Sequence, residues 1–184
     1  MSLSKPSPRQ LVHTRLIACH GYQRQDGLWD IEATLEDSKA YSFANRDRDG
    51  IVAGEPIHRM RVRVSVDDAL TIRAAEATTE AGPFAICGDI APAFSALIGL
   101  QIGDGWRRAV NARFTGVAGC THLTELLLGP VATTALQTVV NARSQRQQPA
   151  SDGGAPALID SCHALRGDGP IVKREWPAFY RGKS

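Results

Sequence analysis

Two residues that could form a reactive or metal-binding pair, Cys120 and His122, lie in the segment VAGCTHLTELLLG. Glycines precede them and apolar residues with helical spacing follow, so we expect Cys120 at the N-terminus of a helix. There a thiolate is stabilised by the helix dipole and by free backbone N–H groups, and it can act as a nucleophile or bind a metal. His122 would be a base or a second ligand. The alternative is ordinary core packing of Cys120 beside a hydrogen-bonded His122.

Three further residues extend this pattern. Cys87, in PFAICGDI, also lies between a loop and a predicted helix, and two cysteines in the same setting favour a shared site. His58 opens a predicted strand directly after the loop AGEP, where ligands often originate, although a lone histidine is more often structural. Glu125 lies one helical turn beyond His122, so it would orient this histidine, transfer a proton, or simply cap the first turn.

The elements that must position these residues fall into two groups. Before residue 80, apolar and polar residues alternate as in an antiparallel sheet with one solvated face. The four expected strands are 11–22, 28–36, 58–66 and 69–77. After residue 80 the spacing becomes helical, and the expected helices are 89–98, 104–112 and 121–143. A kink or break is expected at Gly129-Pro130, because proline removes an intrahelical hydrogen bond.

This order predicts an α+β fold, in which an antiparallel sheet from the N-terminal half is covered by C-terminal helices. We expect a single α+β domain over residues 1–143. Residues 144–184 then form a linker and an extended C-terminal arm, with a strand-like IVKREW, that packs back on the domain. Cys162 and His163 lie in this arm, and the sequence does not say whether they join the site.

The composition is that of an ordinary globular protein, with 43% hydrophobic residues and a formal charge of +2. We see no apolar leader and no run approaching the roughly 18 apolar residues of a membrane helix, so we expect a cytoplasmic protein. The expected partner is a small-molecule ligand or substrate, with no nucleic acid and no membrane; a homodimer is left open. Nucleotide-binding and standard hydrolase motifs do not occur in the sequence.

The segments DGLWDIEATLEDSK, GEPIHRM and GCTHLTELL, in this order, resemble a bacterial family known as a domain of unknown function. This resemblance covers residues from about 15 to 142, together with the DSCHAL and REWP segments of the tail. It implies membership of an uncharacterised family and brings little knowledge of function.

More distantly, the order of strands, cysteine, helix and second cysteine resembles the iron–sulfur cluster scaffold proteins of the IscU/NifU type. That resemblance implies an IscU-like fold and a metal site with His58, Cys87 and Cys120 at the three ligand positions. His58 stands in place of the first cysteine, and the Cys-Gly-Asp segment lies at the second position, 87–89. We therefore expect a zinc or iron ion, because thiolates and imidazoles suit both ions. An iron–sulfur cluster is the less favoured alternative.

Three functions follow from these patterns, in order of preference. The first is a small-molecule enzyme of unidentified substrate, either metal-dependent or thiol-dependent, of the lyase, isomerase or hydrolase type. Its catalytic residues would be Cys120, His122 and Glu125. The second is a non-catalytic metal or iron–sulfur binding or carrier protein. The third is an interaction module with a structural thiol-rich core.

Overall fold

The structure is a computed structural model that describes residues 3–146, 156 and 158–182. The chain divides into two units, Met1–Arg146 and Gln147–Ser184. The first unit contains an antiparallel sheet and several helices, so the predicted α+β class is confirmed. The predicted boundary at residue 143 lies close to the division between the units, and most of the predicted linker, residues 147–155, lies outside the described residues.

The sheet has four antiparallel strands in the order β1-β2-β3-β4. The strands are β1 (His13–Gln23), β2 (Trp29–Lys39), β3 (Pro56–Val66) and β4 (Ile72–Ala81). All four strands were predicted, and on β2 and β3 the apolar residues recur at every second position and therefore share one face. On β2 and β3 these apolar positions are buried, whereas most of the edge strand β1 is exposed. The sheet is thus open, with one face against the core.

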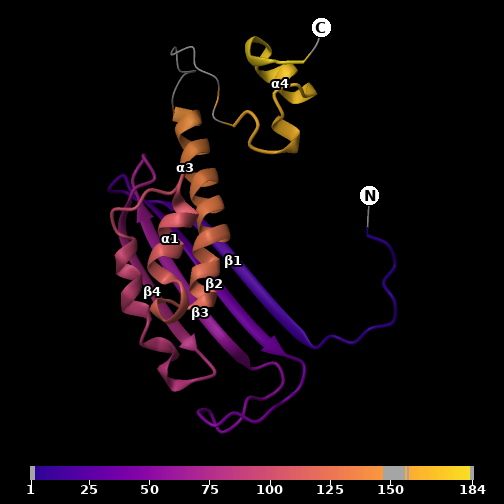
Figure 1. Cartoon of the computed structure of the whole chain (residues 1–184), viewed down its shortest axis with the longest axis vertical. Helices are drawn as coiled ribbons and strands as arrows, with labels where there is room; N and C mark the ends of the chain where they lie inside the picture. Colours follow the sequence, from indigo (N-terminus) through magenta and orange to yellow (C-terminus); the bar gives the residue numbers. More distant parts are fainter. Residues whose placement is uncertain (1–2, 147–155, 157, 183–184) are drawn as a thin grey trace. The chain divides into compact units, whose positions relative to one another are not determined.

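Helices cover the buried face of the sheet (Figure 1). They are α1 (Trp106–Phe114), α2 (Thr121–Leu126) and α3 (Ala132–Arg146), with a π-helical turn, η4 (Leu127–Val131), between the last two. The start of this helical stretch, α2, contacts β2 and β3, and α3 contacts β1 and β2. Leu123, Leu126, Leu127 and Val131 are completely buried. Burial of each such side chain stabilises the fold by about 1.5–3 kcal/mol.

The turn η4 lies at Gly129-Pro130, where the sequence predicts a kink or break. Proline interrupts the regular backbone pattern there, and side chains bind two carbonyl groups of the turn. Trp106 Nε1 donates to the Leu127 carbonyl at 2.9 Å, and Arg107 Nη1 donates to the Leu128 carbonyl at 3.2 Å. These bonds fasten α1 to η4, the turn that follows α2.

The stretch Thr121–Ala142 is long and apolar enough to cross a membrane, with 22 residues and a mean hydropathy of 1.3. The sequence analysis expected no such segment, and by length and composition that expectation is wrong. The core helix of a globular protein passes the same test, however, and the apolar side chains of this helix pack on the sheet. The helix is therefore weak support for a membrane span.

Residues 85–97 differ from their prediction. They form two 3₁₀ helices, η1 (Ala85–Gly88) and η2 (Ala91–Leu97), instead of one α-helix over 89–98. Cys87 consequently lies inside η1 and not before an α-helix. Asp89 does not cap η2, whose first residues include a proline and which has no side-chain cap bond. The two prolines of APAF and PFAI limit regular i to i−4 bonding here.

The second unit contains short helices: η5 (His163–Leu165), α4 (Pro170–Glu175) and η6 (Pro177–Phe179). The predicted strand at IVKREW is wrong, because residues 171–175 belong to α4 and Trp176 follows its end. Pro170 occupies the first helical turn, where its fixed φ favours helix and its missing N–H costs nothing. An ion pair between Asp160 and Arg181 fastens the unit. The described part of the arm is therefore helical and not extended, and its packing on the sheet stays a prediction.

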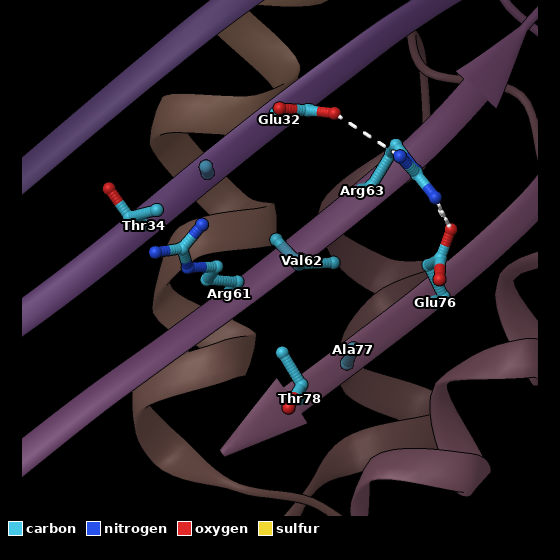
Figure 2. Close-up of a pocket in the computed structure, with 9 residues that line it drawn as sticks. Glu32, Thr34, Arg61, Val62, Arg63, Glu76, Ala77 and Thr78 are labelled. Carbon is cyan, nitrogen blue, oxygen red and sulfur yellow. Dashed lines mark hydrogen bonds and ion pairs between the residues drawn. The ribbon is translucent and has the colours of Figure 1, made fainter. Parts of the chain in front are cut away.

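The outward face of the sheet is a ladder of cross-strand ion pairs, shown in Figure 2 around a shallow hollow. Arg63 lies between Glu32 on β2 and Glu76 on β4, with its Nε 2.8 Å from the Glu76 carboxylate. Arg59 pairs with Glu36 at 2.8 Å in the same way. These charges satisfy one another on an exposed surface, so the hollow needs no ligand to explain its residues.

Candidate functional site

A buried carboxylate, Asp37, lies at the centre of the candidate site. On β2 the inward positions run Trp29, Ile31, Ala33 and Leu35, and the next inward position is Asp37. Its exposed fraction is 1%, which is rare for a charged residue. The sheet register places it opposite Arg15 on β1 and His58 on β3. The sequence analysis missed Asp37, although the alternation that predicts the strand also predicts this position as buried.

Two hydrogen-bonding residues and a further nearby histidine surround the Asp37 carboxylate. Arg15 binds both oxygens, with Nε 2.7 Å from Oδ1 and Nη2 2.8 Å from Oδ2. His58 Nδ1 lies 3.0 Å from Oδ2, and His13 Nε2 lies 3.3 Å from Oδ1. Burial by itself raises the pKa of Asp37, but the hydrogen bonds and charges of Arg15 and His58 lower it below its usual value. The carboxylate is therefore ionised, and it accepts three hydrogen bonds, two from Arg15 and one from His58.

His58 lies near the start of β3, two residues after Pro56, with its side chain on the buried face. Because the nitrogen facing the ionised Asp37 carries the proton, the other ring nitrogen, Nε2, is left as an acceptor. Burial lowers the pKa of His58, and the neighbouring Asp37 offsets this only in part. The imidazole is consequently neutral at pH 7.

His122 stacks on His58, with ring centroids 3.9 Å apart and planes tilted by 33°. Its Nε2 lies 3.7 Å from Asp37 Oδ2, and its Nδ1 lies 4.0 Å from Cys120 Sγ. The ring thus stands between a carboxylate and a thiol, with a different nitrogen toward each. Burial, followed by the charges of His58 and Arg15, lowers the pKa of His122. A neutral ring with its proton on Nε2 can accept the thiol proton at Nδ1.

Cys120 is the N-cap residue of α2, as predicted, and is half-buried with its Sγ 3.8 Å from Met60 Sδ. The residue before it must be glycine: a Cβ on Gly119 would lie 2.2 Å from the carbonyl oxygen of Phe114. This close passage of the chain beneath the end of α1 sets the direction from which Cys120 enters the helix.

Glu125 contacts a different residue from the one expected. Its Oε2 accepts a 2.6 Å hydrogen bond from Arg15 Nη1. Since the other two nitrogens of this guanidinium bind Asp37, Arg15 joins the two carboxylates. Glu125 therefore helps to position Arg15, and a direct role toward His122 stays a prediction. Arg15 was missed because only the pairing of β1 with β2 places it beside Asp37.

A cleft of about 470 Å³ opens over these residues. His58, Cys87, Cys120 and His122 all belong to its lining, so the structure gathers the predicted residues at one cavity. Much of the remaining lining is apolar: Met60, Pro83, Phe84, Ile86, Ile90 and Val117. Cys162 and His163 lie in the second unit, and their relation to the cleft stays open.

The most compact set of metal-ligating side chains differs from the predicted set. One ligand atom from each of Asp37, His58 and His122 lies within 4.8 Å of the other two. Across the described residues, no such group includes Cys87 or Cys120. The predicted trio of His58, Cys87 and Cys120 thus shares a cleft without forming this compact group, and its binding of zinc or iron stays a prediction.

Comparison with protein families matches residues 13–137 to a family described as "Protein of unknown function (DUF2889)". The matched residues include every residue of the candidate site in the first unit. No curated protein and no solved structure matches the chain. The resemblance to scaffold proteins of the IscU/NifU type therefore stays a prediction.

Proposed function

We propose, for a chain that belongs to the DUF2889 family of proteins of unknown function, that it is an enzyme acting on a small molecule through the thiol of Cys120. One observation carries the proposal: the His122 ring lies between Cys120 Sγ and the buried Asp37 carboxylate. In this order the thiol is the nucleophile, the imidazole is its base, and the negative charge of the carboxylate favours the tautomer with the proton on Nε2, which faces it at 3.7 Å. The reaction class that suits the set is hydrolysis of an ester or thioester.

The reaction needs only these three residues and water. Cys120 gives its proton to His122 Nδ1 as the sulfur attacks the carbonyl carbon, and an S–C bond forms. The bond to the leaving alcohol or thiol breaks, and His122 returns the proton to that group. A water molecule then attacks the acyl-enzyme, losing a proton to His122, and the proton passes to the Cys120 sulfur when the acid leaves.

His58 and Arg15 support this set from behind. The stacked ring of His58 limits the rotation of His122, and the guanidinium of Arg15 fixes the carboxylate that faces both rings. Both are positioning residues, since neither is the nucleophile or its base.

A second candidate is a zinc or iron protein whose ligands are Asp37, His58 and His122, favoured by the compactness of these three side chains. Two imidazoles and a carboxylate suit either ion. Against it, Asp37 Oδ2 already accepts hydrogen bonds from Arg15 and His58, so a metal at that oxygen must displace one of them. Cys120 faces the other nitrogen of His122 and would not join this set. A carrier role, including one with an iron–sulfur cluster, would require the Cys87-containing trio.

Acyl trapping tests the thiol proposal. The purified protein is mixed with p-nitrophenyl acetate, quenched within seconds and digested, and mass spectrometry locates the acetyl group. We expect acetyl on Cys120, its loss in Cys120→Ala, and at least about a hundredfold slower acylation in His122→Gln. Cys162→Ser, which removes the exposed thiol of the second unit, is the matched control and keeps the full rate. Acylation confined to Cys162, or unchanged by His122→Gln, would exclude the proposal.

Elemental analysis tests the metal candidate. Protein equilibrated with Zn²⁺ and dialysed is compared with His58→Ala, His122→Ala and Cys120→Ser. Stoichiometric zinc that both histidine variants lose and Cys120→Ser keeps would support the Asp37, His58 and His122 set. Loss in Cys120→Ser and Cys87→Ser would support the predicted trio instead. Absence of retained zinc in the wild-type protein would exclude zinc binding by both sets.

A further inference from the structure

We infer that the cleft over Cys120 binds an uncharged substrate whose acyl part is apolar, an aliphatic or aromatic ester or thioester. This inference rests on the proposed function, because it names the class of molecule that the thiol acts on. Two features of the cleft carry it independently of each other. They are the apolar side chains exposed at its mouth and the charges of its lining.

Three large apolar side chains at the mouth are exposed to solvent although they line the cleft. The exposed fractions are 59% for Phe84, 71% for Ile86 and 103% for Val117. The exposure of each apolar side chain costs free energy that a bound apolar group would recover by covering it. Neighbouring apolar exposure of this kind marks a binding surface. Because it is continuous with Cys120 and His122, the ligand that covers it also reaches the thiol.

The backbone holds the apolar mouth in place beside the nucleophile. Val117 lies in a single 3₁₀ turn, Gly116–Ala118, three residues before Cys120. Gly116 enters this turn with a φ of 64°, in the left-handed region that favours glycine, and Gly119 leaves it against the Phe114 carbonyl. The turn is thus fixed at both ends, and the exposure of Val117 follows from the backbone path.

The charges of the lining argue against an anionic substrate. Among the described residues that line the cleft there is no Lys or Arg, and Asp89 supplies a negative charge. The nearest guanidinium in the site, Arg15, is used by Asp37 and Glu125. A carboxylate or phosphate close to the thiol would therefore meet an uncompensated negative charge and neutral imidazoles. An amide, ester or thioester carbonyl meets no such penalty.

Competing thiol reagents test the inference on the full chain. Peptide-resolved mass spectrometry gives the second-order alkylation rate of Cys120 relative to that of the exposed Cys162 in the same sample. N-methylmaleimide is compared with N-hexylmaleimide, and neutral iodoacetamide with anionic iodoacetate. We expect the relative rate of Cys120 to rise about tenfold from methyl to hexyl, as partial burial of the chain predicts. We also expect Cys120 to prefer iodoacetamide over iodoacetate several-fold more than Cys162 does.

Variants at exposed positions keep the test independent of folding. Ile86→Ser and Val117→Ser should remove most of the chain-length preference, measured as the ratio of the N-hexylmaleimide rate to the N-methylmaleimide rate in each variant. Ile98→Ser is the control, because Ile98 is also exposed but lies outside this cleft, and this variant should keep the chain-length preference. Asp89→Asn should reduce the discrimination against iodoacetate.

The outcomes separate this inference from the proposed function. If the N-methylmaleimide rate of Cys120 is the same in wild type and His122→Gln, the thiol is not activated and the proposed function fails. If that rate depends on His122 but the methyl-to-hexyl ratio is flat, the substrate class is wrong while the thiol chemistry stands. A flat ratio with binding of an apolar peptide at Ile86 and Val117 would assign the mouth to a protein partner and overturn the inference.

Discussion

Arg15 and Asp37 lie directly opposite each other on β1 and β2, and the guanidinium grips both oxygens of the buried carboxylate. This pairing explains how the charged Asp37 carboxylate can be buried beneath the helices. It also makes the carboxylate dependent on its partner, since a buried ion that loses its counter-charge is strongly destabilising.

Removal of this guanidinium should therefore be costly. We expect Arg15→Ala to lower the free energy of unfolding by about 3 kcal/mol, because Asp37 remains buried. Urea denaturation measures the change. Arg63→Ala, which breaks an exposed ion pair on the outer face, is the matched control and should cost at most about 1 kcal/mol. Equal losses in the two variants would show that the Asp37 charge is not held by Arg15.

Stability should fall in mild acid. Burial lowers the pKa values of His58 and His122 below the ordinary 6.5, so between pH 6.5 and those pKa values the unfolded chain binds more protons than the folded one. The two histidines leave the free energy of unfolding unchanged above pH 6.5 and lower it below that pH. The pKa of Asp37 is lowered from 3.8, so its own contribution is lost only below that value.

Denaturation curves at pH 8, 7, 6 and 5 measure this effect. His122→Gln cannot be protonated and should lose less stability than the wild type between pH 6.5 and 5. An identical pH dependence of stability in the two proteins would mean that the His122 imidazole has the same pKa in the folded and the unfolded chain. That result would contradict the expectation.

A methyl group at position 119 should disturb both the fold and the site. Gly119→Ala places its Cβ against the Phe114 carbonyl, so the chain must shift, and we expect a loss of about 1–3 kcal/mol together with slower alkylation of Cys120. Gly88→Ala is the control, since nothing lies within 4 Å of the place its methyl group would take, and it should be close to neutral. Normal alkylation in Gly119→Ala would show that the loop relaxes without moving the thiol.

The bond between α1 and the π-helical turn should contribute to stability. Trp106→Phe retains most of the buried ring but leaves the Leu127 carbonyl without its donor, which should cost about 1–3 kcal/mol. Thermal unfolding followed by circular dichroism measures it. Arg107→Ala, which removes an exposed donor to the neighbouring carbonyl, should cost less than about 1 kcal/mol. The reverse order would contradict the importance of this buried bond.

The sheet and part of the site could be predicted because they depend on local patterns. Alternation is sufficient for β2 and β3, since successive side chains point to opposite faces. The same period places His58 inward, and the glycine-to-helix transition places Cys120 at a helix start. Each of His58, Cys87, Cys120 and His122 was predicted from its own local pattern, and the fold places all four at one cleft.

What the sequence analysis missed depends on pairing between distant segments. Asp37 was hidden because an acidic residue near a strand end is usually exposed, and only the inward run from Trp29 to Leu35 marks it as buried. Arg15 becomes relevant only through the β1–β2 register. In the arm, IVKREW is too short for alternation to decide, and Pro170 favoured a helix.

The position of Asp37 also determines how the strands can align during folding. A slip of two residues would keep the apolar face inward but would place the carboxylate opposite Ile17 on β1 and Met60 on β3 instead of Arg15 and His58. Such an alignment buries an unpaired charge, whereas the native one pairs it on both sides. Asp37, the residue that faces the histidines, thus also fixes the register of β1, β2 and β3. Once the sheet is correctly aligned, the carboxylate and His58 are already in contact.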